Sequence, residues 1–401
     1  MIPGFFSIFM LGNSVRVRTR RADAAQKDTL VLEFNTGLSS RPVLREAAYD
    51  EVLRDGGTII RVWLDTAPDI KGGLLYQHRN PTSLMDICQK IAPALPVNLI
   101  CKQNGTETLC VRGNDWLTCS GSEFFERLSH RDEYQIEKID NETRRIFLKK
   151  AEENLRIIYD SKNAPIGRAC ISVGRYGKSE SLNLNGVVTV GGLQSCTLHG
   201  ITGILNGIPE RAARDVAIPM ITADTLSQWA TEQALLIPNL YNDPSEQMEC
   251  ASIIRRCNGE TKTLPVAQYN KNYMSYEDIS AMTLPDEIYI INSFKISDFE
   301  NLNGFKVASG VFVTQIGSWM SILQTPTYIQ WPDELFERKY FSIMNTLGGS
   351  VIESAVKAWG CSLDDIKDQI NEYKEQEKTI GYLHEEEIKD EVFILKMSSD
   401  I

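Results

Sequence analysis

The chain has 401 residues, of which 42% are hydrophobic, and it carries 42 Lys and Arg against 53 Asp and Glu, a formal net charge of -11. This length supplies enough apolar material for two or three domains. The acidic balance argues against general binding to nucleic acid, because a backbone of phosphates attracts basic surfaces.

The chain begins with an apolar run, residues 2–11, and arginines follow it at alternate positions from Arg16. A secretory signal carries its positive charges before the apolar run, so this order argues against an export signal. The run is also much shorter than the roughly 20 residues that cross a bilayer. We therefore expect a cytoplasmic chain without membrane contact.

Three strands are predicted in the first segment. The alternation of apolar and basic residues in "SVRVRTRR" has the period of a half-exposed strand. Two further strands are expected at "DTLVLEF" and "TIIRVWL", the second introduced by the turn pair Gly56 and Gly57. The Pro, Asp and Gly content of "DTAPDIKGG" then indicates a connection between two units.

A second run of helices and strands reaches to about residue 241. A helix is expected at "PTSLMDICQKIAPAL", and strands at "PVNLICK", "ETLCVR", "LRIIYD", "IGRACISV" and "GVVTVGG". The stretch "HGITGILNGIPERAARDVA" is expected to form a strand, a tight turn and a short basic helix with Pro209 in its first turn. A longer helix should follow, capped by Thr222 or Thr225.

The last part of the chain is predicted to be mixed. Helices are expected at "SEQMECASIIRRC" and "RKYFSIMNTLGGSVIESAVKAWG", and strands at "EIYIINS" and "GVFVTQI". The charged stretch "SLDDIKDQINEYKEQEK" is interpreted as a helix with a solvated face, before a final apolar "EVFILKM". The whole pattern predicts an α/β protein of the α+β sandwich type.

Cysteine and histidine patterns favour packing over metal chemistry. The chain has nine cysteines and no Cys-x-x-Cys pair, which favours reduced thiols over a disulfide framework. Four cysteines recur at regular spacing but lack the close pairs of a zinc site, and we interpret them as buried thiols: Cys88, Cys101, Cys110 and Cys119. His199 near Cys196 is interpreted as a packed histidine beside a buried thiol. No metal site is predicted.

Two stretches carry signals of anion binding. In "PGFFSIFMLG", a glycine before an apolar helical turn can present backbone N–H groups to a phosphate, although the same pattern also suits a turn in the core. In "GIPERAARDVA", Arg211 and Arg214 would share one face of a helix and meet an anion. The alternative is that both form ordinary ion pairs with Glu210 or Asp215.

These stretches resemble the GHKL (Bergerat-fold, histidine-kinase-like) ATPases, and most closely the ninety-kilodalton heat-shock chaperone family. In that family a motif of the form G-x-G-F-Y-S-x-F covers the triphosphate, and a later Gly-Thr at the start of a strand lies beneath the adenine. The first motif is matched in its second half and the later pair is matched in full by the following residues: Gly4, Phe5, Phe6, Ser7, Gly57 and Thr58.

The second stretch resembles a segment of the same family, of the form P-L-N-V-S-R-E, whose arginine reaches the γ-phosphate. In "PERAARD", Pro209 matches the proline, Arg214 the arginine, and Asp215 replaces the glutamate. Arg211 stands at the position of the family's asparagine, and Ile218 at that of an assisting glutamine. The resemblance therefore implies that Arg214, with Arg211 beside it, contacts the phosphates of ATP bound with Mg²⁺.

The resemblance implies three parts. Residues 1–65 are expected to be the C-terminal half of a GHKL nucleotide-binding domain, and residues 75–241 a chaperone-like middle domain, a two-layer α/β sandwich. Residues 242–401 form a mixed α/β region of unassigned role. ATP binding and hydrolysis would drive domain closure, with a client or partner protein and a homodimer implied by the same resemblance.

Two GHKL residues have no counterpart in this sequence. In that family an adenine-binding aspartate and a general-base glutamate precede the phosphate lid. The chain is therefore expected to resemble an N-terminally truncated member that does not hydrolyse ATP on its own. The alternative is a non-enzymatic protein-interaction module that never binds ATP.

Overall fold

The computed structural model describes residues 8–77, 80–128, 141–172, 185–212, 214–300, 302–316, 321–326, 329–337 and 342–397. The chain forms two compact units. The first consists of residues 1–91, 98–111 and 209–214, and the second of residues 92–97, 112–208 and 215–401. Both units contain helices and strands, which confirms the predicted α+β class.

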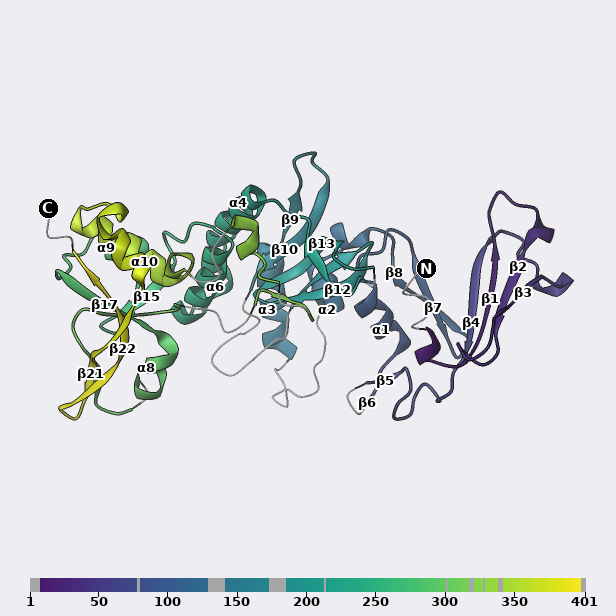
Figure 1. Ribbon diagram of the computed structural model, residues 1–401, viewed down its shortest axis with the longest axis horizontal. Helices are drawn as coiled ribbons and strands as arrows, with labels where there is room; N and C mark the ends of the chain where they lie inside the picture. Colours follow the sequence, from purple (N-terminus) through teal and green to yellow (C-terminus); the bar gives the residue numbers. More distant parts are fainter. Residues whose placement is uncertain are drawn as a thin grey trace. The chain divides into compact units, whose positions relative to one another are not determined.

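The first unit contains a four-stranded antiparallel sheet of order β3-β2-β1-β4, with its strands labelled in Figure 1. The strands are β1 (Ser14–Arg20), β2 (Leu30–Phe34), β3 (Val43–Glu46) and β4 (Gly57–Trp63). Three of them confirm the predicted strands. Strand β3 was not predicted, because four residues are too few to show an alternating pattern.

A smaller hairpin and a helix complete the regular structure of the first unit. Helix α1 packs against both strands of the hairpin β7-β8. The remaining elements are α1 (Leu84–Ile91), β5 (Tyr76–Gln77), β6 (Asn80–Pro81), β7 (Leu99–Gln103), β8 (Thr106–Val111), and the 3-10 turns η2 (Gln26–Asp28) and η3 (Tyr49–Glu51). The predicted helix and the two predicted strands of this region are confirmed.

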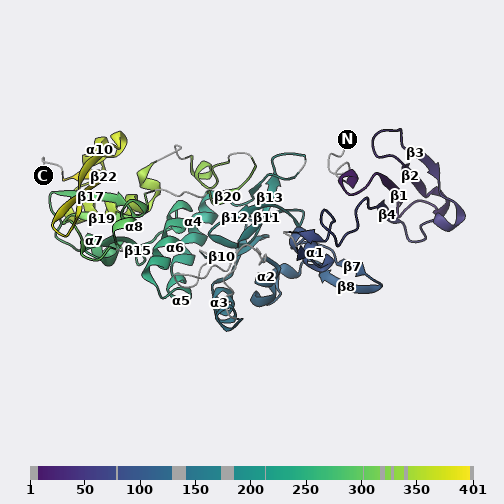
Figure 2. The same cartoon turned by 90° about the horizontal axis from the view of Figure 1, so that it is seen from below.

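The second unit begins with a seven-stranded sheet. Its main path runs β20-β12-β11-β13-β10-β9, and β14 pairs with β13; Figure 2 shows β20, β12, β11 and β13 side by side. The strands are β9 (Arg156–Tyr159), β10 (Pro165–Ile171), β11 (Gly186–Val190), β12 (Leu193–Leu198), β13 (Ile201–Pro209), β14 (Ala217–Pro219) and β20 (Leu323–Gln324). β11 and β13 are parallel, and β10 is antiparallel to β13.

Helices pack against this first sheet of the second unit. α3, α4 and α6 contact β10, and α2 packs on α3. The helices are α2 (Gly121–Leu128), α3 (Asn141–Asn154), α4 (Ala223–Ala234), α5 (Ile237–Leu240) and α6 (Pro244–Arg256), with the 3-10 turn η4 (Asp115–Leu117) before them. The Thr222 side chain accepts a hydrogen bond from the Thr225 N–H, which confirms Thr222 as the cap of α4.

A buried glutamine ties two of these helices to the sheet. The Gln233 side chain on α4 is fully buried. Its Nε2 donates to the Asn154 carbonyl at the end of α3 at 3.0 Å, and its Oε1 accepts from the Ile171 N–H at the end of β10 at 2.9 Å. Because buried polar groups destabilise a core unless they are hydrogen-bonded, this side chain fixes the positions of three elements at once.

Helix α2 carries a buried arginine that forms an ion pair. Only 2% of the Arg127 side chain is exposed. Its Nη1 and Nη2 donate to the two carboxylate oxygens of Asp115 at 2.8 and 2.9 Å, and Nη1 also donates to the Pro93 carbonyl at 3.1 Å. The bidentate contact with Asp115 joins α2 to η4, and the hydrogen bond to Pro93 joins α2 to the segment before η4.

A second seven-stranded sheet, of order β16-β15-β19-β17-β22-β21-β18, forms the rest of the second unit. Its strands are β15 (Pro265–Tyr269), β16 (Asn272–Ser275), β17 (Glu287–Asn292), β18 (Phe305–Val307), β19 (Val311–Thr314), β21 (Glu375–Leu383) and β22 (Glu386–Lys396). The other elements are α7 (Tyr276–Ser280), α8 (Ser293–Glu300), α9 (Leu347–Trp359), α10 (Lys367–Glu372), η5 (Asp333–Phe336), η6 (Ile343–Asn345) and η7 (Leu363–Ile366).

Both faces of this sheet are covered. On β19, Phe312 belongs to the large core that also includes residues of α9, whereas Val311 and Val313 belong to a separate core with Ile296 of α8. In Figure 1, α9 and α8 lie on opposite sides of the sheet. Successive side chains of a strand point to opposite faces, so the continuous apolar run "GVFVT" suits a strand buried on both sides.

Two sequence predictions are wrong. The described residues from Pro209 to Ala217 include no helix: Pro209 is the last residue of β13, and a turn follows before β14. The charged stretch near the end forms only η7 and α10, after which β21 begins at Glu375. In the second case the hairpin partner β22 supplies backbone hydrogen bonds that local composition does not reveal.

No helix in the described part of the chain is both long enough and apolar enough to cross a membrane.

Candidate functional site

The polar face of the first sheet is covered by a network of four charged side chains. Arg16 and Arg45 both contact Glu33, at 2.8 and 2.9 Å, and Arg45 also donates to both carboxylate oxygens of Glu51, at 2.6 and 2.9 Å. The hydrogen bonds from Arg45 lower the pKa of Glu51 to about 2 and also lower the pKa of Glu33. Arg16 of β1 is thus held by an acid of the neighbouring strand β2.

This network predicts a loss of stability of the first unit in acid. The carboxyl of Glu51 has an ordinary pKa near 4.5, and its pKa in the folded protein is about 2. A lowered folded pKa stabilises the fold at pH values above the ordinary pKa, and that contribution disappears as the pH falls through the folded pKa. We therefore expect the midpoint of thermal unfolding of the first unit to fall between about pH 4.5 and about pH 2.

The measurement is thermal unfolding of the wild type and of Glu51→Gln at a series of pH values. Glu51→Gln should be less stable at neutral pH and should show a flatter dependence over the acidic range. Parallel curves for the two proteins would contradict this role of Glu51.

Arg20 is a buried cation that binds backbone carbonyls. Its Nε donates to the Leu53 carbonyl at 2.8 Å and its Nη2 to the Arg54 carbonyl at 3.0 Å, and its Nη1 donates to the carbonyls of Arg21 and Ala24. The guanidinium thus holds the loop after β1 against the loop before β4. These hydrogen bonds fix the position of the chain just before the turn at Gly56 and Gly57, from which β4 begins.

Gly57 and Thr58, the pair that the family resemblance places beneath the adenine, lie at the start of β4. Gly56 and Gly57 have φ angles of 77° and 100°, which only glycine adopts readily. A Cβ on Gly56 would lie 3.1 Å from the Cα of Ala22, so the two loops approach closely here. Thr58 is exposed, and its Oγ1 lies 2.8 Å from that of Thr19 on the neighbouring strand. The predicted turn pair is confirmed, and the side chain of Thr58 is accessible to a ligand.

The predicted phosphate-lid residues Gly4, Phe5, Phe6 and Ser7 lie outside the described residues. The apolar run that continues from them contributes Ile8 and Phe9, which pack against the small core of the first sheet. Phe9 contacts the ring of Phe34 with the centroids 5.0 Å apart. The end of this run therefore packs on the apolar face of the sheet.

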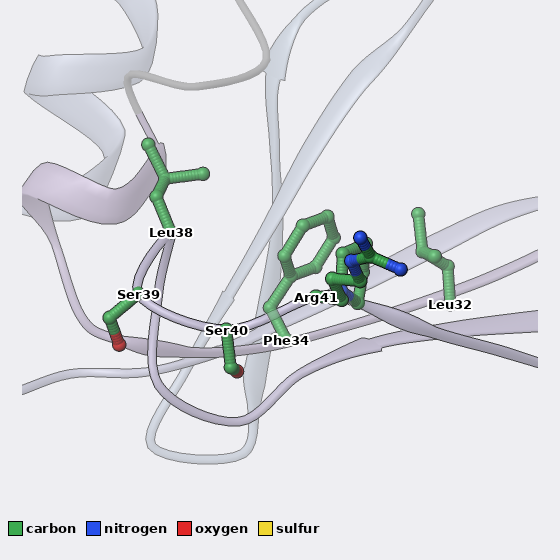
Figure 3. A pocket seen from close by; sticks show the side chains of 7 residues that line it. Leu32, Phe34, Leu38, Ser39, Ser40 and Arg41 are labelled. Atoms are coloured by element: carbon green, nitrogen blue, oxygen red, sulfur yellow. The ribbon is translucent and has the colours of Figure 1, made fainter.

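A pocket of about 570 Å³ opens beside β2. Leu32 and Phe34 on β2 line it together with the segment 38–42 that follows, and Figure 3 shows these side chains at close range. Most of the exposed lining is apolar, with Ser39, Ser40 and Arg41 adding polar atoms. Thr58 does not line this pocket. The pocket was not predicted, because the segment 38–42 that completes its lining carries no motif.

The predicted arginine pair lies in the loop between β13 and β14. The Arg214 N–H donates to the Arg211 carbonyl at 2.9 Å, and Arg214 has a φ angle of 60°, in the left-handed region. Both residues are exposed. Because this is a turn, the two side chains do not share a helix face, and that prediction is wrong. Residues 209–214 belong to the first unit, together with β4 and Thr58.

The side chain of Arg214 is exposed, and within the described part of the chain its guanidinium takes part in no ion pair. An anion contact of this residue, like the alternative of a local pair with Glu210 or Asp215, stays a prediction. An exposed guanidinium presents five N–H donors in a planar fork that suits phosphate oxygens.

The side chain of Cys196 is buried. Its sulfur accepts a hydrogen bond from the Ala217 N–H at 3.3 Å, which confirms the interpretation of Cys196 as a packed thiol.

No family model matches the chain, and no curated protein matches it either. Among the described residues, no group of three or more His, Cys, Asp or Glu side chains is placed to hold a metal ion.

Proposed function

We propose that this chain is part of a chaperone-like ATP-binding protein in which the loop 209–214 contacts the terminal phosphate of the nucleotide. The observation that carries the proposal is the state of Arg214, which is exposed, held in a tight turn and engaged in no ion pair within the described residues. Its loop belongs to the same compact unit as Gly57 and Thr58.

The chemistry of two described residues, Arg214 and Thr58, supports an adenine nucleotide as the ligand. A guanidinium at Arg214 would bind the terminal phosphate and stabilise the charge that develops during phosphoryl transfer. Thr58 offers a hydroxyl for the base, next to a glycine turn that brings backbone close to a ligand. ATP bound with Mg²⁺ would supply the phosphoryl group, and the general base would come from a glutamate that this sequence does not identify.

A phosphate contact made by a loop can also report the state of the nucleotide. The contact with the terminal phosphate exists before hydrolysis and is lost with that phosphate. Such a differential contact is what couples a ligand to a conformational equilibrium. We propose that domain closure, in contact with a client or partner protein and in a homodimer, follows from this coupling.

The test of the proposed function is ATP binding and hydrolysis by the full-length gene product and by its Arg214→Gly variant. Saturable binding of ATP, with hydrolysis that depends on Arg214, supports the proposal. The absence of ATP binding by the full-length product would reject it.

A second candidate function is a protein-interaction module, and the apolar face of the first sheet favours it. The register places Leu30, Leu44 and Ile60 on the same face as Val17, and these three side chains are 41%, 64% and 48% exposed. The apolar pocket beside β2 opens next to them. Contiguous exposed apolar surface of this kind is typical of sites of protein contact.

Two neighbouring isoleucines on β4 allow a matched test of this face. Ile60 points to the apolar face, whereas Ile59 pairs with Arg18 on the polar face and is 44% exposed, close to the 48% of Ile60. We expect Ile60→Lys to lower the fluorescence of a bound hydrophobic dye, because a charge interrupts the apolar surface. Ile59→Lys should leave the dye signal unchanged.

Circular dichroism checks that both lysine variants stay folded. An equal loss of dye binding in the two variants would show that the dye does not bind specifically to the apolar face.

A further inference from the structure

Three of the nine cysteines gather in a small core of the first unit. Cys101 of β7 and Cys110 of β8 are buried, with 8% and 4% of their surface exposed, and Cys88 of α1 packs against them from the helix. All nine cysteines of the chain are free thiols. The sequence spacing showed regularity but not this proximity, which arises when α1 packs on the β7-β8 hairpin.

Cys110 occupies an irregular position in the hairpin. Leu99 pairs with Val111 and Ile100 pairs with Leu109, so Cys110 is the extra residue of a β-bulge. A bulge residue is left out of the regular ladder of backbone hydrogen bonds. The side chain of Gln89 on α1 compensates, because its Nε2 donates to the Cys110 carbonyl at 3.0 Å. The residue next to Cys88 therefore anchors the helix directly on Cys110.

The three thiols of this cluster belong to one small core, in which Cys88 packs against the buried Cys101 and Cys110. The Cys110 thiol donates a hydrogen bond to the Thr108 carbonyl, with the sulfur and the oxygen 3.7 Å apart. Burial raises the pKa of Cys88, and it raises the pKa of Cys110 to about 12. Both groups are therefore protonated in the reduced protein at neutral pH, and their reaction with an oxidant is slow rather than absent.

We propose that Cys88 and Cys110 form a reversible disulfide when the protein meets a small-molecule disulfide such as oxidised glutathione. Cys88 is the partly exposed member of the cluster, so the oxidant reaches it first. Cys110 lies at a bulge, where the backbone adjusts more easily than in a regular ladder.

The reaction balances in two exchange steps. The Cys88 thiolate attacks one sulfur of oxidised glutathione, forms a mixed disulfide and releases one glutathione thiolate. The Cys110 thiolate then attacks the Cys88 sulfur and releases the second glutathione thiolate. The protein loses two protons and two electrons and gains one sulfur–sulfur bond, and the oxidant is reduced to two glutathione molecules. The new bond joins α1 covalently to the hairpin.

The test is oxidation of the folded full chain with oxidised glutathione, followed by alkylation of the remaining thiols, digestion with trypsin and mass spectrometry. Cleavage after Arg79, Lys90, Lys102 and Arg112 places each of the three cysteines on its own peptide: 80–90, 91–102 and 103–112. We expect peptides 80–90 and 103–112 to be linked, and dithiothreitol to separate them. After oxidation of the folded protein and subsequent denaturation, two fewer thiols should react with the alkylating reagent.

Three serine variants assign the bond. Cys88→Ser and Cys110→Ser should each abolish the linked peptide, and Cys101→Ser should retain it. Cys361→Ser is the matched control, because Cys361 is also partly exposed with a pKa raised by burial but lies in the second unit. It should retain the link.

Oxidised protein in which peptide 91–102 carries the link would overturn the assignment, as would the loss of the link in Cys101→Ser. A wild-type protein that is oxidised for a prolonged time while folded, and that still has nine alkylatable thiols after denaturation, would overturn the proposal itself. Circular dichroism of each variant confirms that it is folded.

Discussion

We expect the Arg214→Gly variant of the full-length protein to hydrolyse ATP about 10³ to 10⁵ times more slowly than the wild type, which is the range for an arginine that stabilises a transferring phosphoryl group. The affinity for ATP should change much less, because the charge on the transferring group is largest in the transition state. Glycine is the substitution of choice. Arg214 has a φ angle of 60°, and glycine adopts this angle without strain.

The control for this variant is Lys271→Gly. Lys271 is also an exposed cation with a positive φ angle, 67°, and it lies in the turn between β15 and β16. The substitution therefore removes the same charge from the same kind of backbone, far along the sequence from the loop 209–214. Hydrolysis by Lys271→Gly should equal that of the wild type. An Arg214→Gly variant that hydrolyses ATP at the wild-type rate would contradict the role of Arg214.

The second large effect is expected in the second unit. Arg127→Met should lower the free energy of unfolding by about 3–5 kcal/mol, the usual cost of removing one partner from a buried ion pair. The substitution leaves the Asp115 carboxylate, which is 15% exposed, without the two hydrogen bonds that it accepts from Arg127. It also leaves the Pro93 carbonyl without its donor. Urea denaturation measures the effect, with tryptophan fluorescence as the signal, since Trp116 is buried beside Asp115.

The matched control is Arg145→Met. Arg145 on α3 also pairs with an acid, Glu142, at 2.8 Å, but the two side chains are 75% and 63% exposed. Exposed ion pairs contribute about 0–1 kcal/mol, so this variant should unfold at nearly the wild-type urea concentration. Equal midpoints for the Arg127 and Arg145 variants would show that burial of the first pair does not matter to stability.

Periodicity in the sequence predicted the strands whose two faces differ in chemistry. β1 alternates valine and arginine, and the structure places the valines in a small core and Arg16 in an ion network. The same method failed for β21, whose charged residues pair with β22 across a hairpin. A strand that is stabilised mainly by its partner shows no pattern of its own, because register is a property of two segments.

The candidate site was predicted only where a short motif carried it. Gly57 and Arg214 were chosen as candidates from the residues around them, and their roles stay predictions; the helix expected around Arg214 is a turn. The role of Arg20 was not predicted, since its acceptors are carbonyls of loops that the fold brings together. The cysteine cluster was not predicted for the same reason. Its members come from a helix and two strands, and only the packing of α1 on the hairpin makes them neighbours.

The position of the Arg214 guanidinium in the presence of nucleotide tests the central claim most directly. A structure of the full-length protein with Mg²⁺ and a non-hydrolysable ATP analogue would show it. We predict that the guanidinium lies within hydrogen-bond distance, about 2.7–3.2 Å, of an oxygen of the terminal phosphate. An analogue bound with Arg214 turned to solvent, or paired with a carboxylate instead, would contradict the account.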